Sequence, residues 1–142
     1  MEKTNRFQNY DVAFLSEFAP DLGPVVMIKM EKSEINAPPS IYFNEIVKSM
    51  TDSGDYTQEE PISHDKYRIG GNQADSVVLT HQKGGTTYAM LYVNSLINGQ
   101  NFSVTYDYVP SSFDKFLPTV DKMINSITIG AGCLPERRVL LN

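Results

Sequence analysis

The sequence has little of several residue types, and each shortage excludes a class of protein. Cys133 is the single cysteine among 142 residues, so an intramolecular disulfide and a multi-cysteine zinc site are both excluded. Tryptophan is absent and only two histidines are present. The apolar runs are a few residues long, too short for a segment that crosses a bilayer. Residues 1–10 are polar, so no signal peptide is predicted.

Positive charge is also scarce. The chain has 12 Lys and Arg against 17 Asp and Glu, a net charge of −5 at pH 7. Because affinity for nucleic acid comes mainly from clustered cations, we expect no nucleic-acid binding. The length suits one domain, which we place at residues 10–129. Residues 1–9 are predicted to be a loose or disordered start, and residues 130–142 a C-terminal tail.

The strongest structural signal is a block of three strands joined by tight turns. Asn98-Gly99 predicts a two-residue type I′ hairpin, because both positions of that turn need a positive φ. The turn sets a register in which Val93 lies opposite Val104 and Leu91 lies opposite Tyr106. This face is almost entirely apolar and is predicted to be the main core; the other face is mixed and is expected to be partly covered. The three strands are predicted at 74–82, 86–97 and 100–109.

The rest of the chain adds strands and two helices. The first helix is predicted to follow Ser40 as N-cap and to end near Gly54. The second has Ser111 as its predicted N-cap, and Pro118 predicts a restart, with the regular helix at 118–126. The order is β-β-α-β-β-β-β-β-α, an α+β arrangement of one antiparallel sheet with helices packed on it. The other predicted strands are 10–18, 25–30, 55–60, 62–69 and a short one at 128–129.

Catalytic constellations are scarce. His64 and His81 are the only histidines, and no G-x-S-x-G nucleophile motif is present. The sequence therefore predicts a protein that is not an enzyme. A hydrolase-like enzyme centred on His64 and Asp65 remains an alternative.

Metal-binding patterns are weak as well. H-x-x-x-H, C-x-x-C and EF-hand patterns are all missing. Weak candidate ligands are nonetheless available in His64, Asp65, His81 and Asp107. Acidic pairs that offer oxygen ligands to a hard cation such as calcium are Glu59 with Glu60, Asp52 with Asp55, and Asp75 with Asp107.

Tyrosines along the hairpin form a candidate partner surface. Tyr88, Tyr92 and Tyr106 offer large area with a polar tip, which suits a protein interface. The same properties suit a half-buried sheet, so both interpretations stay open. Cys133 and the basic pair Arg137-Arg138 fall in the tail and are assigned no role.

Several short motifs follow one another in a particular order along the chain. They are Asp11-Val12-Ala13-Phe14 with Val25-Val26-Met27-Ile28, Ile69-Gly70-Gly71-Asn72-Gln73-Ala74, the hairpin segments Thr87–Val93 and Asn101–Tyr106, and Phe116-Leu117-Pro118 through Ile127. In the order of these motifs, and not in one diagnostic pattern, the span from Tyr10 to Ile129 resembles the PsbP-like family, the fold of the extrinsic photosystem II protein PsbP and its non-photosynthetic relatives. The chain departs from the family in having no tryptophan and no visible export signal or lipid anchor.

The resemblance implies an α/β/α sandwich with a central antiparallel sheet. It also implies a non-catalytic accessory domain that docks on a larger protein complex, often at a membrane surface. Its compartment would be extracytoplasmic or thylakoid-lumenal. A small-ligand or divalent-metal-binding domain is the alternative, since some relatives bind calcium or other divalent metals. A photosystem II oxygen-evolving complex subunit proper is a narrower form of the accessory function. No cofactor site is carried over onto this sequence.

Overall fold

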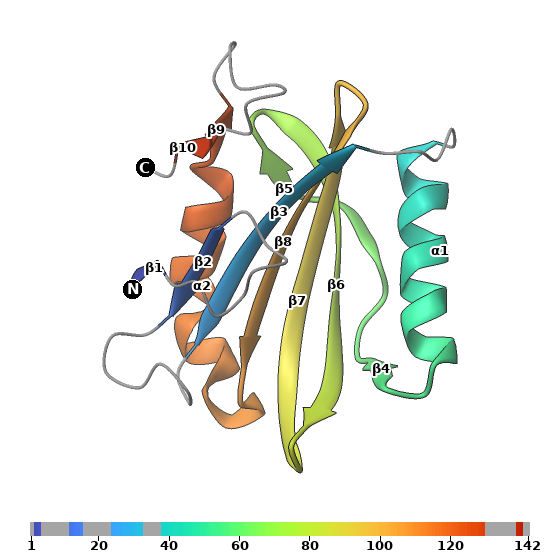
Figure 1. Ribbon diagram of the computed structural model, residues 1–142, viewed down its shortest axis with the longest axis vertical. Coiled ribbons are helices and arrows are strands. Elements are labelled where there is room, and N and C mark those ends of the chain that lie inside the picture. Colours follow the sequence, from blue (N-terminus) through green and yellow to red (C-terminus); the bar gives the residue numbers. More distant parts are fainter. Residues whose placement is uncertain (1, 4–11, 16–23, 33–37, 130–138, 141–142) are drawn as a thin grey trace.

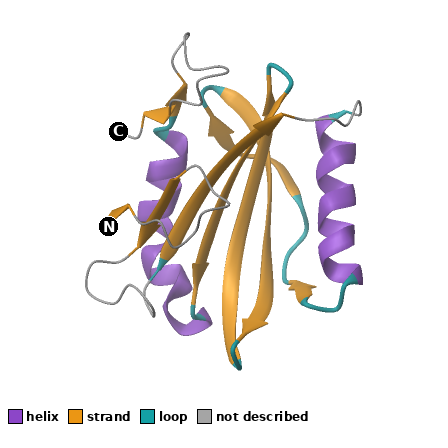
Figure 2. Cartoon of the chain, in the orientation of Figure 1, coloured by secondary structure: helices purple, strands orange, loops and turns teal. Residues whose placement is uncertain are grey.

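One antiparallel sheet with a helix on each face forms the domain (Figure 1, Figure 2). The computed structural model describes residues 2–3, 12–15, 24–32, 38–129 and 139–140. Helix α1 covers one face and helix α2 the other, so the predicted α+β fold, an α/β/α sandwich, is confirmed.

The elements follow the predicted order between residues 10 and 129. The large sheet has the strand order β1-β2-β3-β8-β7-β6-β4, and β5 also pairs with β6. A separate two-stranded sheet joins β9 and β10. The elements are β1 (Glu2–Lys3), β2 (Val12–Leu15), β3 (Val25–Lys32), α1 (Pro39–Asp52), β4 (Tyr56–Gln58), β5 (Ser63–Ile69), β6 (Asn72–Lys83), β7 (Thr86–Ile97), β8 (Gln100–Tyr108), α2 (Pro110–Asn125), β9 (Thr128–Ile129) and β10 (Val139–Leu140).

The turn between β7 and β8 sets the register of the central strands. Asn98 has φ 50° and Gly99 has φ 76°, the positive values that a type I′ turn requires. Val93 pairs with Val104 and Leu91 pairs with Tyr106, as predicted. One face of the sheet is therefore apolar along its whole central part.

The two faces of the sheet carry two separate hydrophobic clusters. The larger contains Leu91, Val93, Val104 and Tyr106, so the face predicted to be the main core is confirmed. It lies on the α2 side and joins strands β3, β5, β6, β7 and β8 to α2. The smaller lies on the α1 side and is completed by half-buried residues of α1 and of the β4–β5 region. Its buried members are Phe43, Val47, Val77, Leu79, Met90 and Tyr92. The α1 side therefore mixes this cluster with polar residues, and it is where the candidate site lies.

The predicted serine N-caps are wrong. Helix α1 begins at Pro39 and α2 at Pro110, each without a hydrogen bond from a capping side chain. Proline suits the first helical position because its φ is already helical and its missing N–H would be unpaired there. Ser40 and Ser111 therefore lie inside the first turn of their helices.

The predicted restart at Pro118 is also wrong, because α2 continues through it. Phe113 lies before the proline, and Val120 and Ile124 lie after it; all three are buried against the sheet. Burial of one apolar face on both sides of Pro118 outweighs the single backbone hydrogen bond that proline removes.

Both predicted loose ends contain a short paired segment. Glu2–Lys3 pairs with β2, and Val139–Leu140 pairs with β9. Cys133 and the Arg137-Arg138 pair lie outside the described residues.

Candidate functional site

Two histidine–aspartate pairs lie on the α1 side of the sheet. Nδ1 of His64 is 2.6 Å from Oδ1 of Asp75, joining β5 to β6. Nε2 of His81 is 2.6 Å from Oδ1 of Asp107, joining β6 to β8 across the intervening strand β7. Asp75, Val77 and His81 lie an even number of positions apart along β6, so their side chains lie on the same face of the sheet. Val77 belongs to the α1-side cluster, which places both pairs on that face.

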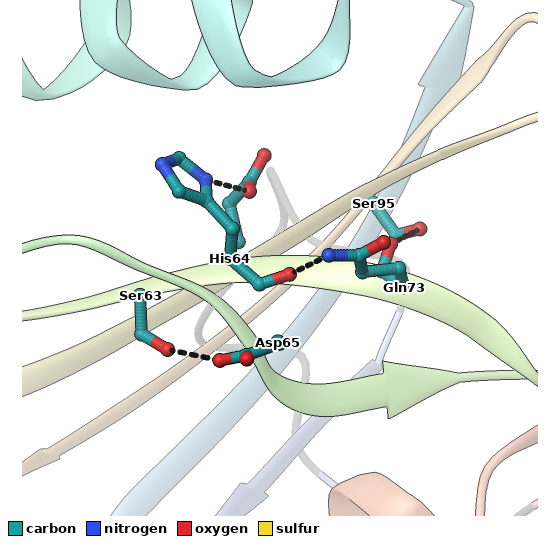
Figure 3. Close-up of polar contacts among 6 residues, drawn as sticks. Ser63, His64, Asp65, Gln73 and Ser95 are labelled. Carbon is teal, nitrogen blue, oxygen red and sulfur yellow. Dashed lines mark hydrogen bonds and ion pairs between the residues drawn. The ribbon is translucent and has the colours of Figure 1, made fainter.

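An irregularity in β5 sets the direction of the His64 ring. The pairing of β5 with β6 shifts register between Ser63 and Tyr67, the region that contains His64. His64 points toward the α1 side, whereas Ser63 and Asp65 point the opposite way (Figure 3). Ser63 Oγ donates to Asp65 Oδ1 at 3.4 Å. Irregularities of this kind re-aim side chains and are common beside functional sites.

Neighbouring strands hold the backbone at His64 in place (Figure 3). The Gln73 side-chain amide donates to the His64 carbonyl oxygen. Ser95 Oγ in turn donates to the Gln73 carbonyl oxygen at 3.0 Å. His64 is therefore fixed by its backbone as well as by its ring.

The His64 pair combines an exposed imidazole with a buried carboxylate. The His64 side chain is 47% exposed, and that of Asp75 is 10% exposed. An ionised carboxylate only accepts hydrogen bonds, so the Nδ1–H group of His64 is the donor and Asp75 Oδ1 the acceptor. In the neutral ring Nε2 is then an acceptor, and no described residue hydrogen-bonds to it.

The His81 pair is enclosed. Its side chain is 15% exposed, and the ring stacks between Tyr56 and Tyr88 at centroid distances of 5.2 and 5.7 Å. Both tyrosines lie directly opposite His81 on the neighbouring strands. These contacts cover both faces of the imidazole, and Nε2 is hydrogen-bonded to Asp107. The pair therefore links β6 to β8 across β7.

The four predicted metal-ligand candidates are not brought together at one point. His64 and Asp65 point to opposite sides of β5 (Figure 3), while His81 pairs with Asp107. Within the described ranges, no group of three or more His, Cys, Asp and Glu side chains is arranged to hold a metal ion. The sequence did not link His64 to Asp75, because their contact depends on the irregular pairing of β5 with β6.

A buried polar network lies near the start of α1 on the same face. Asn101 Nδ2 donates to the Tyr42 hydroxyl at 2.8 Å, and Asn94 Nδ2 donates to Asn101 Oδ1. Thr105 also faces this side and is 9% exposed, yet its Oγ1 has no hydrogen-bond partner among the residues that the structure describes. A buried hydroxyl without a partner costs free energy, so Thr105 is an unsatisfied polar group on this face.

The predicted tyrosine surface is wrong for two of its three members. Tyr92 is buried and stacks on Phe43 of α1 at 5.4 Å between centroids. Tyr106 is completely buried; its hydroxyl donates to the Phe113 carbonyl at 2.8 Å, and burial raises its pKa above the ordinary tyrosine value. Of the three, Tyr88 is half-buried. Tyr92 is covered by α1, whereas Tyr106 lies on the opposite face and is covered by α2.

Tyr67 anchors β5 to α2 on the opposite side of the sheet. Its hydroxyl donates to Asp121 Oδ1 at 2.5 Å. Burial, and then the hydrogen bond and negative charge of Asp121, raise the pKa of Tyr67 above its ordinary value. Arg68 N–H donates to Asn125 Oδ1 at 3.2 Å, so α2 also occupies part of the outer edge of β5.

Among the described residues, neither helix is long and apolar enough to cross a membrane. The sequence matches no protein-family model, and no curated protein matches it.

Three solved structures are similar over most of the chain. PA94 of Pseudomonas aeruginosa, a protein of unknown function, is 14% identical with a TM-score of 0.69, covering 83% of this chain and 81% of its own. LpqN of Mycobacterium tuberculosis, involved in cell envelope biogenesis, is 12% identical with a TM-score of 0.58, covering 92% and 70%. Cyanobacterial PsbP (CyanoP) of Synechocystis sp. PCC 6803 is 15% identical with a TM-score of 0.52, covering 80% and 71%. These similarities show that the chain has a PsbP-like fold, as its motifs predicted.

Proposed function

We propose that this PsbP-like domain is a non-catalytic accessory module that binds a larger protein assembly. The observation that carries the proposal is His64, which is exposed, fixed by Asp75 and Gln73, and hydrogen-bonded to no nucleophile in the described part of the chain. A fixed polar group at a surface suits recognition, because little side-chain freedom is lost when a partner binds.

The hydrolase alternative fits the geometry poorly. Catalysis by a histidine dyad needs a nucleophile within hydrogen-bond distance of the ring. Within the described residues, no hydroxyl or thiol hydrogen-bonds to His64 or His81. Ser63, the nearest hydroxyl in sequence, points away from His64 and bonds to Asp65 (Figure 3).

The proposed location is an extracytoplasmic membrane surface. It is supported by the resemblance to PsbP and by the similarity to LpqN, which is involved in cell envelope biogenesis. Fold alone does not select the partner, since one fold hosts many unrelated functions. A subunit of the photosystem II oxygen-evolving complex is a narrower form of the same proposal.

Affinity capture tests the proposal directly. The immobilised domain is passed over soluble extract and detergent-solubilised membranes of the source organism, with heat-unfolded domain as the control. We expect a stoichiometric membrane complex to be retained by the folded domain alone. Retention of nothing from either extract would refute the accessory function.

A small-ligand-binding domain is the second candidate. It is favoured by one observation, the buried Thr105 hydroxyl on the α1 side, for which the described ranges hold no hydrogen-bond partner. A polar ligand that accepts this hydrogen bond would bind more weakly to a Thr105→Val variant. Calorimetric titration of wild type and variant with the small molecules recovered from the purified protein distinguishes this function from protein docking.

A further inference from the structure

We propose that α1 is a hinged cover on the sheet, which detaches and unfolds locally while α2 and the strands stay in place. The inference goes beyond the proposed function and does not depend on it. It is argued from a contrast between the two helices, which lie on opposite faces of one sheet (Figure 1). They differ in their apolar packing, in their hydrogen bonds to the sheet and in their own stability as helices.

The apolar packing of α1 is the less extensive of the two. The apolar side chains of α1 that pack in the cluster on its side of the sheet are Phe43, Ile46, Val47 and Met50. Those of α2 that pack in the larger cluster are Phe113, Phe116, Leu117, Val120, Met123 and Ile124. Because hydrophobic stabilisation grows with the apolar area removed from water, separating α1 from the sheet costs less free energy than separating α2.

Hydrogen bonds between helix and sheet hold α2 along its whole length but hold α1 near its start. Helix α2 is bonded to the sheet through Phe113, Asp121 and Asn125. Among the described residues, α1 is bonded to it where Asn101 Nδ2 donates to the Tyr42 hydroxyl at 2.8 Å. Asn101 is 3% exposed, so its amide regains hydrogen bonds to water when α1 detaches, and this lowers the cost of detachment.

Once detached, α1 is not expected to remain helical. It has 14 residues, and isolated helices of about this length are marginal in water. Its first turn has no acidic residue and its last turn no basic one, whereas the last turn of α2 contains Lys122. Asp52, the last residue of α1, places a negative charge at the negative end of the helix dipole. Detachment therefore exposes the backbone N–H groups of α1 to solvent, where it can be measured.

The turn after α1 is the proposed hinge. Gly54 has φ 83°, a conformation that glycine adopts without strain, and no described atom lies within 4 Å of the position that a Cβ atom would take there. Beyond this turn, β4 is paired with β6, with Tyr56 opposite His81. Rotation of the backbone between Ser53 and Asp55 therefore moves the helix without breaking the sheet.

Amide hydrogen exchange, followed by nuclear magnetic resonance at a series of low urea concentrations, tests the cover in the wild-type protein. Relative to their intrinsic rates, we expect the hydrogen-bonded amides of α1 to exchange at least about tenfold faster than those of β7, β8 and α2. Their exchange should depend little on urea, because local opening exposes little surface. Equal protection with an equal urea dependence would show that α1 leaves the sheet only in global unfolding, and the inference would be overturned.

Two tyrosine variants separate detachment of α1 from a general loss of stability. Tyr42→Phe removes the acceptor of Asn101 Nδ2 and should speed exchange in α1 about tenfold. Tyr106→Phe is the matched control, because it removes a hydroxyl bonded to Phe113 of α2, a contact that is kept when α1 opens. It should speed exchange in α2 and the central strands and leave exchange in α1 unchanged.

The variants can also overturn the inference. If Tyr106→Phe speeds exchange in α1 as much as Tyr42→Phe does, the two helices open together and α1 is not a separate cover. If Tyr42→Phe leaves exchange in α1 unchanged, the contact with Asn101 does not hold the helix closed, and the proposed cover is again wrong. Neither result bears on the accessory function, which affinity capture tests by itself.

Discussion

Pro118 offers a sharp test of how α2 is held on the sheet. The residue is exposed within a helix that runs from Pro110 to Asn125. Proline has no N–H, so the carbonyl of Asp114, four residues earlier, lacks its helical partner. We expect Pro118→Ala to restore this bond without disturbing the buried face of the helix.

The size of the effect follows from two opposing terms. Proline inside a helix costs about 3 kcal/mol relative to alanine. Proline also restricts the unfolded chain, and losing that restriction returns roughly 0.4–1 kcal/mol to the unfolded state. The difference predicts a free energy of unfolding raised by about 2 kcal/mol.

Urea unfolding followed by circular dichroism measures the change. With an m-value of about 2 kcal/mol per molar, the midpoint should rise by about 1 M. Thr119→Ala is the matched control, because it is exposed on the same turn and should gain no more than about 0.7 kcal/mol. An unchanged or lower midpoint for Pro118→Ala would show that the helix breaks at residue 118, and the continuity argument would be refuted.

Three further predictions use the same unfolding assay. Thr105→Val removes a buried hydroxyl without a partner and should raise the free energy of unfolding by about 1 kcal/mol; a decrease would show that the hydroxyl is bonded. The raised pKa of Tyr67 means that its neutral form stabilises the fold fully below pH about 10 and that this contribution is lost as the pH rises further. Tyr67→Phe should therefore lose stability less steeply than wild type above that pH, and equal slopes would contradict the assignment. Tyr42→Phe removes the acceptor for buried Asn101 Nδ2 and should cost about 1–2 kcal/mol; no loss would mean that the network contributes nothing.

Local chemistry made parts of the fold predictable. The type I′ turn at Asn98-Gly99 depends on the φ preferences of two adjacent residues, so its register followed from the sequence. Helix caps were less predictable. Serine and proline are both favourable near a helix start, and which of them lies at the first helical position depends on how the helix enters the packed layer.

The candidate site was predictable only in its histidines. His64 and His81 stand out because they are the only two in the chain, and the tight turn after β6 places His81 opposite Tyr88. The partner of His64 was not predictable, since Asp75 reaches it only through the shifted pairing of β5 with β6. The same sequence pattern left Tyr92 and Tyr106 ambiguous between surface and core, and α1 and α2 decide it by covering them.

The sequence by itself determined the order of elements along the chain, the register of the central hairpin and the class of fold, because hydrophobic periodicity and turn residues act over a few neighbouring positions. Only the tertiary structure decided which side chains on the mixed face are covered and which histidine keeps a free nitrogen. Those outcomes depend on contacts between residues far apart in the chain, such as Asn101 with Tyr42 and His81 with Asp107. Such contacts form only when the sheet and helices have packed, so no local preference specifies them.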